Sequence, residues 1–182
     1  LAGVSQQTEA LRKRSVTMAA IALGGGIWSM HFVAMLGVKM PGEYFYDPVI
    51  TLLSAMVAVL VVGLALLVLH FWRRTNFTIT AAGLVVGIGV LAMHYIGMSG
   101  MRGAVPTYSY LGIALAIVTS LASNVGVFWL AYGRRTNRNI VLGTVFFGIS
   151  VFSVHFIAML GTHFQPDAAS IASDFTLSNT AL

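Results

Sequence analysis

The sequence predicts an all-α fold, a polytopic transmembrane helical bundle built from parallel internal repeats. Hydrophobic residues make up 58% of its 182 residues and charged residues only 8%, whereas a typical soluble domain carries roughly 25% charge. The uncharged residues form five long runs, and a pattern centred on histidine occurs three times. Because lipid offers no partner to an unpaired backbone group, each run is expected to be a helix. This composition excludes an ordinary soluble enzyme.

Each of the five runs is long enough to cross a hydrocarbon core of about 30 Å. The first run follows three basic residues, but it is too long for the core of a signal peptide, so we expect it to remain in the protein. Residues 1–166 are expected to form one transmembrane domain, and residues 167–182, rich in Ser, Thr and Ala, an external polar tail. The expected spans are residues 16–38, 48–72, 77–101, 108–133 and 139–162.

The basic residues indicate how the chain crosses the membrane. Eight of the ten Lys and Arg residues fall at alternate ends of the runs, and therefore on one side of the bilayer. By the positive-inside rule this side is cytoplasmic, and the N-terminal end lies there. Because these residues occur in small clusters between apolar runs, they indicate topology and no nucleic-acid partner. They are Arg12, Lys13, Arg14, Arg73, Arg74, Arg134, Arg135 and Arg138.

The internal repeat is centred on His31, His94 and His155, at a spacing of roughly 60 residues. A glycine comes seven residues before each histidine, and a methionine comes four residues after it. At about 100° per residue these three positions share one helix face. A glycine on that face lets a neighbouring helix approach closely, so the face is expected to be packed inside the bundle. The glycines are Gly24, Gly87 and Gly148, and the methionines are Met35, Met98 and Met159.

Successive repeats keep the same orientation, which predicts a pseudo-threefold arrangement about an axis along the membrane normal. The first copy lacks the linking span that the others have, so we expect a further span upstream, and another beyond Leu182. The distance in sequence from each basic cluster to its histidine corresponds to about 25–30 Å along a helix. All three histidines are therefore expected in one layer near the outer surface.

The His and Met residues of this layer predict a metal site. Imidazole binds copper, zinc and iron, whereas thioether sulfur selects soft ions, above all Cu(I). The chain has no cysteine, so a thiolate site is excluded and copper is expected ahead of zinc. The expected ligands are His31, His94, His155, Met35, Met98 and Met159, with Met30, Met93 and His163 as secondary ligands.

The motif Met93-His94-Tyr95 within these repeats resembles the MHYT domain, a family of bacterial integral-membrane sensors. The other copies depart from the motif, because Phe32 and Phe156 replace the tyrosine and Val154 replaces the first methionine. The motif's threonine is absent from all three copies, where Val33, Ile96 and Ile157 stand in its place.

The resemblance implies a non-catalytic, multi-pass sensor module of the bacterial inner membrane, often fused to domains that make and degrade cyclic di-GMP. It also implies a copper site near the outer face that responds to oxygen, carbon monoxide or nitric oxide, or to redox state. The expected partners are the lipid bilayer, a small gas molecule, a cytoplasmic output domain in cis or in trans, and a second copy of the chain in a homodimer.

Three other functions fit parts of the sequence. Gly97-Met98-Ser99-Gly100 matches the Gly-x-Ser-Gly pattern of intramembrane serine hydrolases, with His155 or His163 as the base. A metal or proton transporter or channel would use the glycines at 24–26 as a hinge and the polar patch around Asn124. In a purely structural or dimerising module, each imidazole would only bond across a helix interface.

Overall fold

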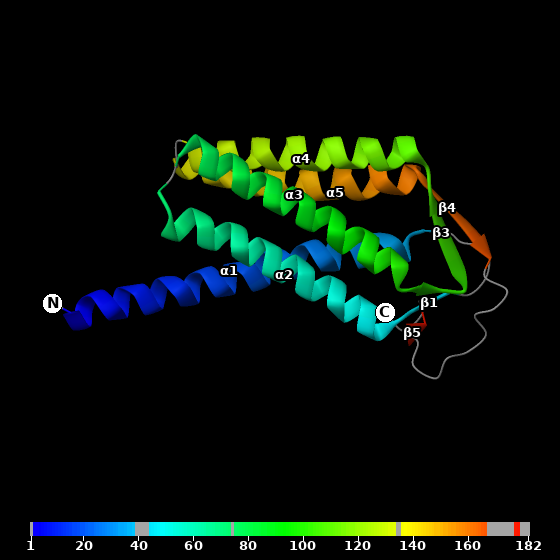
Figure 1. Cartoon of the computed structure of the whole chain (residues 1–182), viewed down its shortest axis with the longest axis horizontal. Coiled ribbons are helices and arrows are strands. Elements are labelled where there is room, and N and C mark those ends of the chain that lie inside the picture. The colour runs from blue at the N-terminus through cyan, green and yellow to red at the C-terminus, as the bar shows by residue number, and fades with distance from the viewer. Residues whose placement is uncertain (1, 39–43, 74, 134–135, 167–176, 179–182) are drawn as a thin grey trace.

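The computed structural model describes residues 2–38, 44–73, 75–133, 136–166 and 177–178 (Figure 1). It confirms the all-α prediction, because the described chain has five helices long and apolar enough to cross a membrane. Large apolar side chains such as Leu60, Phe77 and Leu111 are exposed on their outer surfaces, as lipid contact requires. The helices are α1 (Ala2–Leu36), α2 (Pro48–Phe71), α3 (Asn76–Ser99), α4 (Tyr110–Gly133) and α5 (Asn137–Leu160).

Helices that follow one another in the sequence pack side by side, from α1 against α2 to α4 against α5 (Figure 1). The three helices that carry a repeat histidine are α1, α3 and α5, which we call the histidine-bearing helices. They touch one another over a much shorter stretch. Every second helix runs in the same direction, as parallel repeats predict. Neighbouring repeats therefore meet mainly through α1 against α2 and α3 against α4, and all three repeats come together where α1, α3 and α5 converge.

The first helix begins well before the expected span. α1 starts at Ala2, so its basic cluster lies within the helix and not ahead of it. Lys13 pairs with Glu9 at 2.8 Å, and the Arg12 guanidinium lies 4.2 Å from the centre of the Phe71 ring. These contacts stabilise the charged side chains of Lys13 and Arg12 on the helix. They help α1 to extend on the N-terminal side of the apolar run. The other four helices begin and end within two residues of the expected spans.

Short polar side chains fix where the later helices begin. The Asp47 carboxylate accepts hydrogen bonds from the backbone N–H groups of Val49 and Ile50, and Pro48 occupies the first turn of α2. Thr75 and Thr136 accept in the same way at the starts of α3 and α5. Such caps satisfy N–H groups that the first helical turn leaves without partners.

Short strands, which the sequence analysis did not expect, join the helices at the end opposite the basic clusters (Figure 1). β1 pairs antiparallel with β2 and with β5, and β3 pairs antiparallel with β4. The pairing satisfies backbone groups that have left the helices but remain close to the apolar core. The strands are β1 (Phe45–Tyr46), β2 (Met101–Arg102), β3 (Ala104–Tyr108), β4 (Thr162–Pro166) and β5 (Leu177–Ser178).

Two equivalent junctions show the repeat in three dimensions. The Asp47 backbone N–H donates to the Gly100 carbonyl at 2.8 Å, and the Ser109 backbone N–H donates to the Gly161 carbonyl at 2.8 Å. Each linking helix thus starts on the C-terminal end of the next histidine-bearing helix. The expected external tail lies outside the described residues, apart from Leu177–Ser178.

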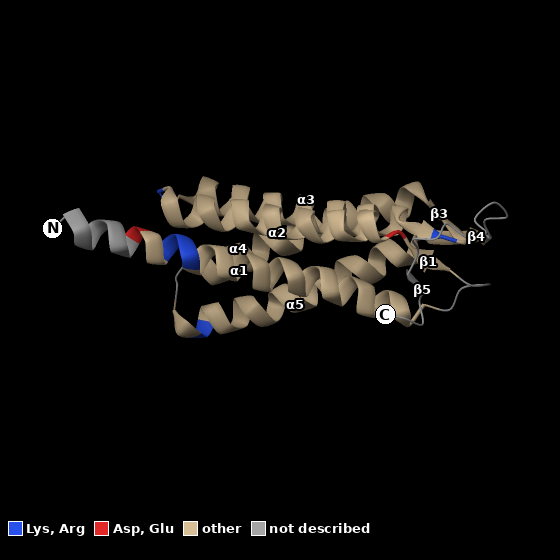
Figure 2. Cartoon of the chain, turned by 90° about the horizontal axis from the view of Figure 1, so that it is seen from below, with Lys and Arg blue, Asp and Glu red and all other residues tan. Residues whose placement is uncertain are grey.

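Described charges gather at the two ends of the bundle (Figure 2). The basic clusters lie in the N-terminal half of α1, just after the C-terminal end of α2 and at the start of α5. Arg102 and Asp47 lie at the opposite end of the bundle. We call these the basic end and the strand end. Three of the eight basic residues that indicate the orientation lie outside the described chain, namely Arg74, Arg134 and Arg135.

The repeat glycines differ in their surroundings. A Cβ added to Gly24 would lie 2.5 Å from the Val59 Cα, and one added to Gly87 would lie 3.0 Å from the Ser120 carbonyl oxygen. These two glycines therefore allow α1 to approach α2 and α3 to approach α4. A Cβ added to Gly148 would meet no described atom within 4 Å. The expected close contact is not formed there, because no described helix packs on that side of α5.

Gly24→Val is expected to destabilise the protein by about 1–3 kcal/mol, because its new methyl groups would overlap the α2 backbone. Gly148→Val makes the same chemical change on an open face and serves as the matched control. Thermal unfolding in one detergent would measure both, and equal losses of stability in the two variants would contradict the packing difference.

Candidate metal centre

The structure brings His31, His94 and His155 together inside the bundle. They come from α1, α3 and α5, and their relative exposures are 1%, 2% and 3%. One ring nitrogen from each histidine lies within 4.8 Å of the others. Since the three helices run in the same direction and carry histidine at the same repeat position, their convergence brings the three imidazoles into one cluster.

His31 is the centre of the His cluster. Its Nδ1 lies 3.1 Å from the His155 Nδ1 and 3.2 Å from the His94 Nδ1. The rings meet edge to face, at interplanar angles between 77° and 82°. A neutral imidazole nitrogen either donates or accepts, so the His31 Nδ1 plays the same role toward both neighbours. The three Nε2 atoms are buried and have no hydrogen-bond partner among the described residues.

The two Nδ1 separations around His31 are close to those that a single metal ion would impose. Two nitrogens that each lie about 2.0–2.1 Å from a tetrahedral metal are about 3.3 Å apart. The observed separations of 3.1 and 3.2 Å are close to this value. In the described chain the cluster contains three imidazoles and no carboxylate. Its donors are therefore neutral, and a bound ion would keep its whole charge in an apolar environment.

Two of the methionines four residues after the histidines, Met35 and Met98, belong to a second group, which we call the cap. The cap covers the strand side of the His cluster and consists of Phe32, Met35, Tyr44, Tyr46, Met98, Met101 and Ala104. Met35 and Met98 are fully buried within it, and Met159 is half-buried against it. Thioether sulfur is thus present one helical turn beyond the imidazoles in all three repeats.

The secondary candidates lie elsewhere. Met93 is buried and Met30 half-buried in the main apolar core, a group of buried side chains from all five helices that includes Val62, Val90 and Val151. His163 is exposed in β4, where its carbonyl oxygen accepts a hydrogen bond from Thr107, and it is not a member of the His cluster.

Two tyrosines were missed by the sequence analysis. The Tyr46 ring packs edge-on against Phe32, and the Tyr108 ring packs edge-on against Tyr95, each with centroids 5.1 Å apart. Burial raises the pKa of Tyr108 to about 12, and burial also raises the pKa of Tyr46. Both remain neutral at physiological pH. A tyrosine just before each linking helix was the sequence signal, but only the structure shows that it contacts the residue after a repeat histidine.

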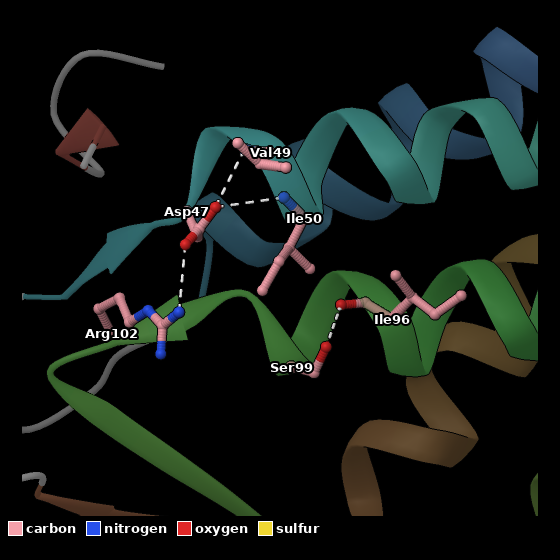
Figure 3. Close-up of polar contacts among 6 residues, drawn as sticks. All are labelled: Asp47, Val49, Ile50, Ile96, Ser99 and Arg102. Carbon is pink, nitrogen blue, oxygen red and sulfur yellow. Dashed lines mark hydrogen bonds and ion pairs between the residues drawn. The ribbon is translucent and has the colours of Figure 1, made fainter. Parts of the chain in front are cut away.

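An ion pair ties the two sides of the strand end together (Figure 3). The Arg102 Nη2 lies 3.1 Å from the Asp47 carboxylate, which also caps α2. The hydrogen bond from Arg102, followed by that from the Ile50 N–H, lowers the pKa of Asp47. The ion pair therefore links the start of α2 to the strand that follows α3.

The serine of the Gly-x-Ser-Gly pattern is bound within its own helix. The Ser99 hydroxyl donates to the Ile96 carbonyl at 2.7 Å (Figure 3). Ser99 is exposed at the end of α3, whereas His155 is buried in the His cluster. The arrangement does not form the serine–base pair that nucleophilic catalysis requires.

The polar patch of α4 joins helices. The Ser120 hydroxyl donates to the Gly87 carbonyl at 2.8 Å, and the Ser123 and Ser150 hydroxyls lie 2.6 Å apart. Within α4 itself, the Asn124 side-chain amide donates to the Ser120 carbonyl at 2.9 Å. Hydrogen bonds between helices of this kind hold membrane bundles together.

The match to a known protein family lies in the region of the internal repeat. The MHYT family model, described as "Bacterial signalling protein N terminal repeat", matches residues 24–83 and 87–144. The chain is 35% identical over 157 residues to the bifunctional diguanylate cyclase/cyclic di-GMP phosphodiesterase MucR of Pseudomonas aeruginosa. It is 31% identical over 159 residues to the signaling protein YkoW of Bacillus subtilis.

These matches cover 80% and 82% of this chain but 22% and 20% of the two relatives. The cyclic di-GMP phosphodiesterase NbdA of Pseudomonas aeruginosa is 35% identical over 127 residues, which are 65% of this chain and 16% of that relative. The chain thus spans about a fifth of the length of the curated relatives that it matches. No solved structure matches it.

The Asp47–Arg102 ion pair predicts a pH dependence. Because the folded-state pKa of Asp47 is lowered, the pair stabilises the protein above the unfolded-state pKa of about 4. That contribution is lost as the pH falls through the lowered pKa. Asp47→Asn retains a capping side chain but removes the charge, so its melting temperature should be lower than that of the wild type at pH 7 and converge with it in acid. A gap that persists unchanged in acid would contradict this.

Proposed function

The chain belongs to the MHYT family, and from this premise we propose that it is a membrane-embedded sensory module that holds a copper ion at the His cluster. The observation that carries the proposal is the convergence of three buried Nδ1 atoms at 3.1 and 3.2 Å. An apolar bundle has no structural need for three histidines at one point, and ionisable groups inside a membrane are typical of functional sites.

The donor set favours copper over zinc. Three neutral imidazoles without a carboxylate leave the charge of a bound ion uncompensated. Because the cost of burying an ion rises steeply with its charge, a monovalent ion is favoured in this environment over a divalent one. Imidazole together with the nearby thioethers of Met35, Met98 and Met159 suits Cu(I). We propose the three histidines as the primary ligands and these methionines as supporting ligands.

A copper ion with three protein ligands would supply an open coordination position for oxygen, carbon monoxide or nitric oxide. The surrounding residues fit such a ligand, because the buried side chains next to the His cluster are aromatic or apolar. Uncharged diatomic molecules can enter such surroundings without leaving a buried charge uncompensated. The proposed signal is therefore a diatomic gas or a change in redox state.

The arrangement of the helices supports a route for the signal. α1, α3 and α5 touch one another over only a short stretch, and the His cluster lies within it. A small change in the spacing of the imidazoles would therefore alter how the three helices sit at the basic end. We propose that the basic end is cytoplasmic, and that the output is a cyclic di-GMP domain like those named in the relatives, in cis or in trans.

Metal analysis of the purified protein tests the primary ligands. We expect one copper per chain after loading with Cu(I), and a loss of affinity on the order of 100-fold in His94→Ala. His163→Ala and His70→Ala remove histidines outside the His cluster and should retain the metal. Preferential retention of zinc, retention of copper by His94→Ala, or rapid copper flux across proteoliposomes would contradict the proposal.

Infrared spectroscopy of carbon monoxide tests the gas site. We expect the Cu(I)-loaded protein to give a carbonyl band that disappears in His155→Ala, because that variant lacks one of the ligands. Phe77→Ala alters an exposed apolar residue far from the His cluster and should leave the band unchanged. A band of equal intensity in metal-free protein would show that carbon monoxide does not bind at the copper.

A further inference from the structure

An apolar cavity of about 180 Å³ lies between the five helices, in the half of the bundle nearer the basic end. Its wall includes Leu23 of α1, Leu66 of α2, Val86 of α3, Phe128 of α4 and Ile140 of α5. The cavity is partly open at the surface of the bundle and partly enclosed by these side chains. Its size is close to that of an engineered apolar cavity of about 150 Å³ that stays dry and binds benzene or xenon.

The chemistry of the wall favours apolar ligands over polar ones. A buried water needs two to four polar partners, and the lining is almost entirely aliphatic and aromatic. The Thr144 hydroxyl, at the wall, already donates to the Ile140 carbonyl at 3.0 Å. The ring of Tyr132 is stacked on Phe128 with centroids 5.8 Å apart. An occupant would therefore make most of its contacts with apolar atoms.

A narrow apolar seam leads from the cavity toward the His cluster. It shares Val62 and Val86 with the cavity and continues past Ile27 and Val90. Ile27 and Val90 are buried, and each lies one helical turn, about 6 Å, below a repeat histidine. The seam has no room for a resting water molecule, so any passage needs the side chains to move. Its apolar walls offer a polar molecule no hydrogen-bond partner, which favours the passage of an apolar one.

The opposite side of the His cluster is closed by the cap. Met35 and Met98 have no exposed surface, and Tyr46 is 1% exposed. A small molecule that reached the His cluster from the strand end would have to displace these side chains. The side of the His cluster that faces the cavity has instead a void and a seam, both lined mainly by apolar side chains.

We propose that this cavity is a binding site for a small apolar gas molecule, which enters from the lipid and moves along the seam to the His cluster. The proposal rests on the proposed function, in which the gas binds to copper at the His cluster. Binding of a gas in the cavity can nevertheless be tested without any metal. Because oxygen is apolar and carbon monoxide and nitric oxide are only weakly polar, the same surfaces that disfavour water and ions would concentrate them.

Xenon is the probe for the metal-free protein in lipid nanodiscs. We expect methyl resonances of Val62, Val86 and Ile140 to shift in a saturable manner as the xenon pressure rises. Methyl groups of Val118 and Ile149, which are exposed on the outer surface, should shift only in proportion to the xenon dissolved in lipid. Linear shifts at the cavity residues, or an acyl chain that occupies the cavity and resists xenon, would overturn the proposal.

Two variants link the cavity to the His cluster. Val86→Phe fills the junction of cavity and seam, and Leu23→Trp fills the rim, where a large side chain is tolerated more readily because Leu23 is 37% exposed. Leu60→Trp is the matched control for Leu23→Trp, because Leu60 is exposed on α2 and lines neither void.

The readout in the copper-loaded protein is the rate at which carbon monoxide rebinds after flash photolysis. We expect it to fall roughly tenfold, equivalent to about 1.4 kcal/mol of barrier, in Val86→Phe and Leu23→Trp but not in Leu60→Trp, with copper content unchanged. An unchanged rate in both cavity variants would overturn the route. Failure to bind copper would instead refute the proposed function, and saturable xenon binding would still support the cavity.

Discussion

The burial of three imidazoles in an apolar, lipid-embedded bundle is the constraint on which the rest of the structure depends. Each imidazole carries polar nitrogens that gain nothing from the surrounding Val, Ile and Met side chains. His31, His94 and His155 therefore meet one another, with Nδ1 separations of 3.1 and 3.2 Å around His31. The cap on one side and the main apolar core on the other keep water away from this contact, and any ion or gas held there would be bound in dry surroundings.

The repeat supplies this convergence by giving α1, α3 and α5 the same direction and the same junctions. Asp47 and Ser109 make equivalent backbone hydrogen bonds to Gly100 and Gly161, so each linking helix begins on the end of the next histidine-bearing helix. The symmetry is incomplete in the described chain. Gly24 and Gly87 contact neighbouring helices, whereas Gly148 lies on an open face, and α5 is accordingly the least enclosed of the three.

Most of the candidate site could be predicted from sequence, because it is periodic. Histidine with methionine one turn later recurs in three runs, so the direction and depth of each run place the three rings in one layer. Tyr46 and the cavity around Val86 could not be predicted in this way. The hydroxyl of Tyr46 is buried by the strand pairing at 45–46, and a void depends on how five helices fit together rather than on any local pattern.

The sequence by itself determined the number of helices, their directions and which histidines share a layer, since these follow from hydrophobic length, basic flanks and helical period. Only the tertiary structure decided that the Nδ1 atoms meet, that the cap closes the strand side and that the cavity lies on the basic side. Sequence periodicity specifies the face of a helix, whereas ring orientation and empty volume depend on contacts among residues from all five helices.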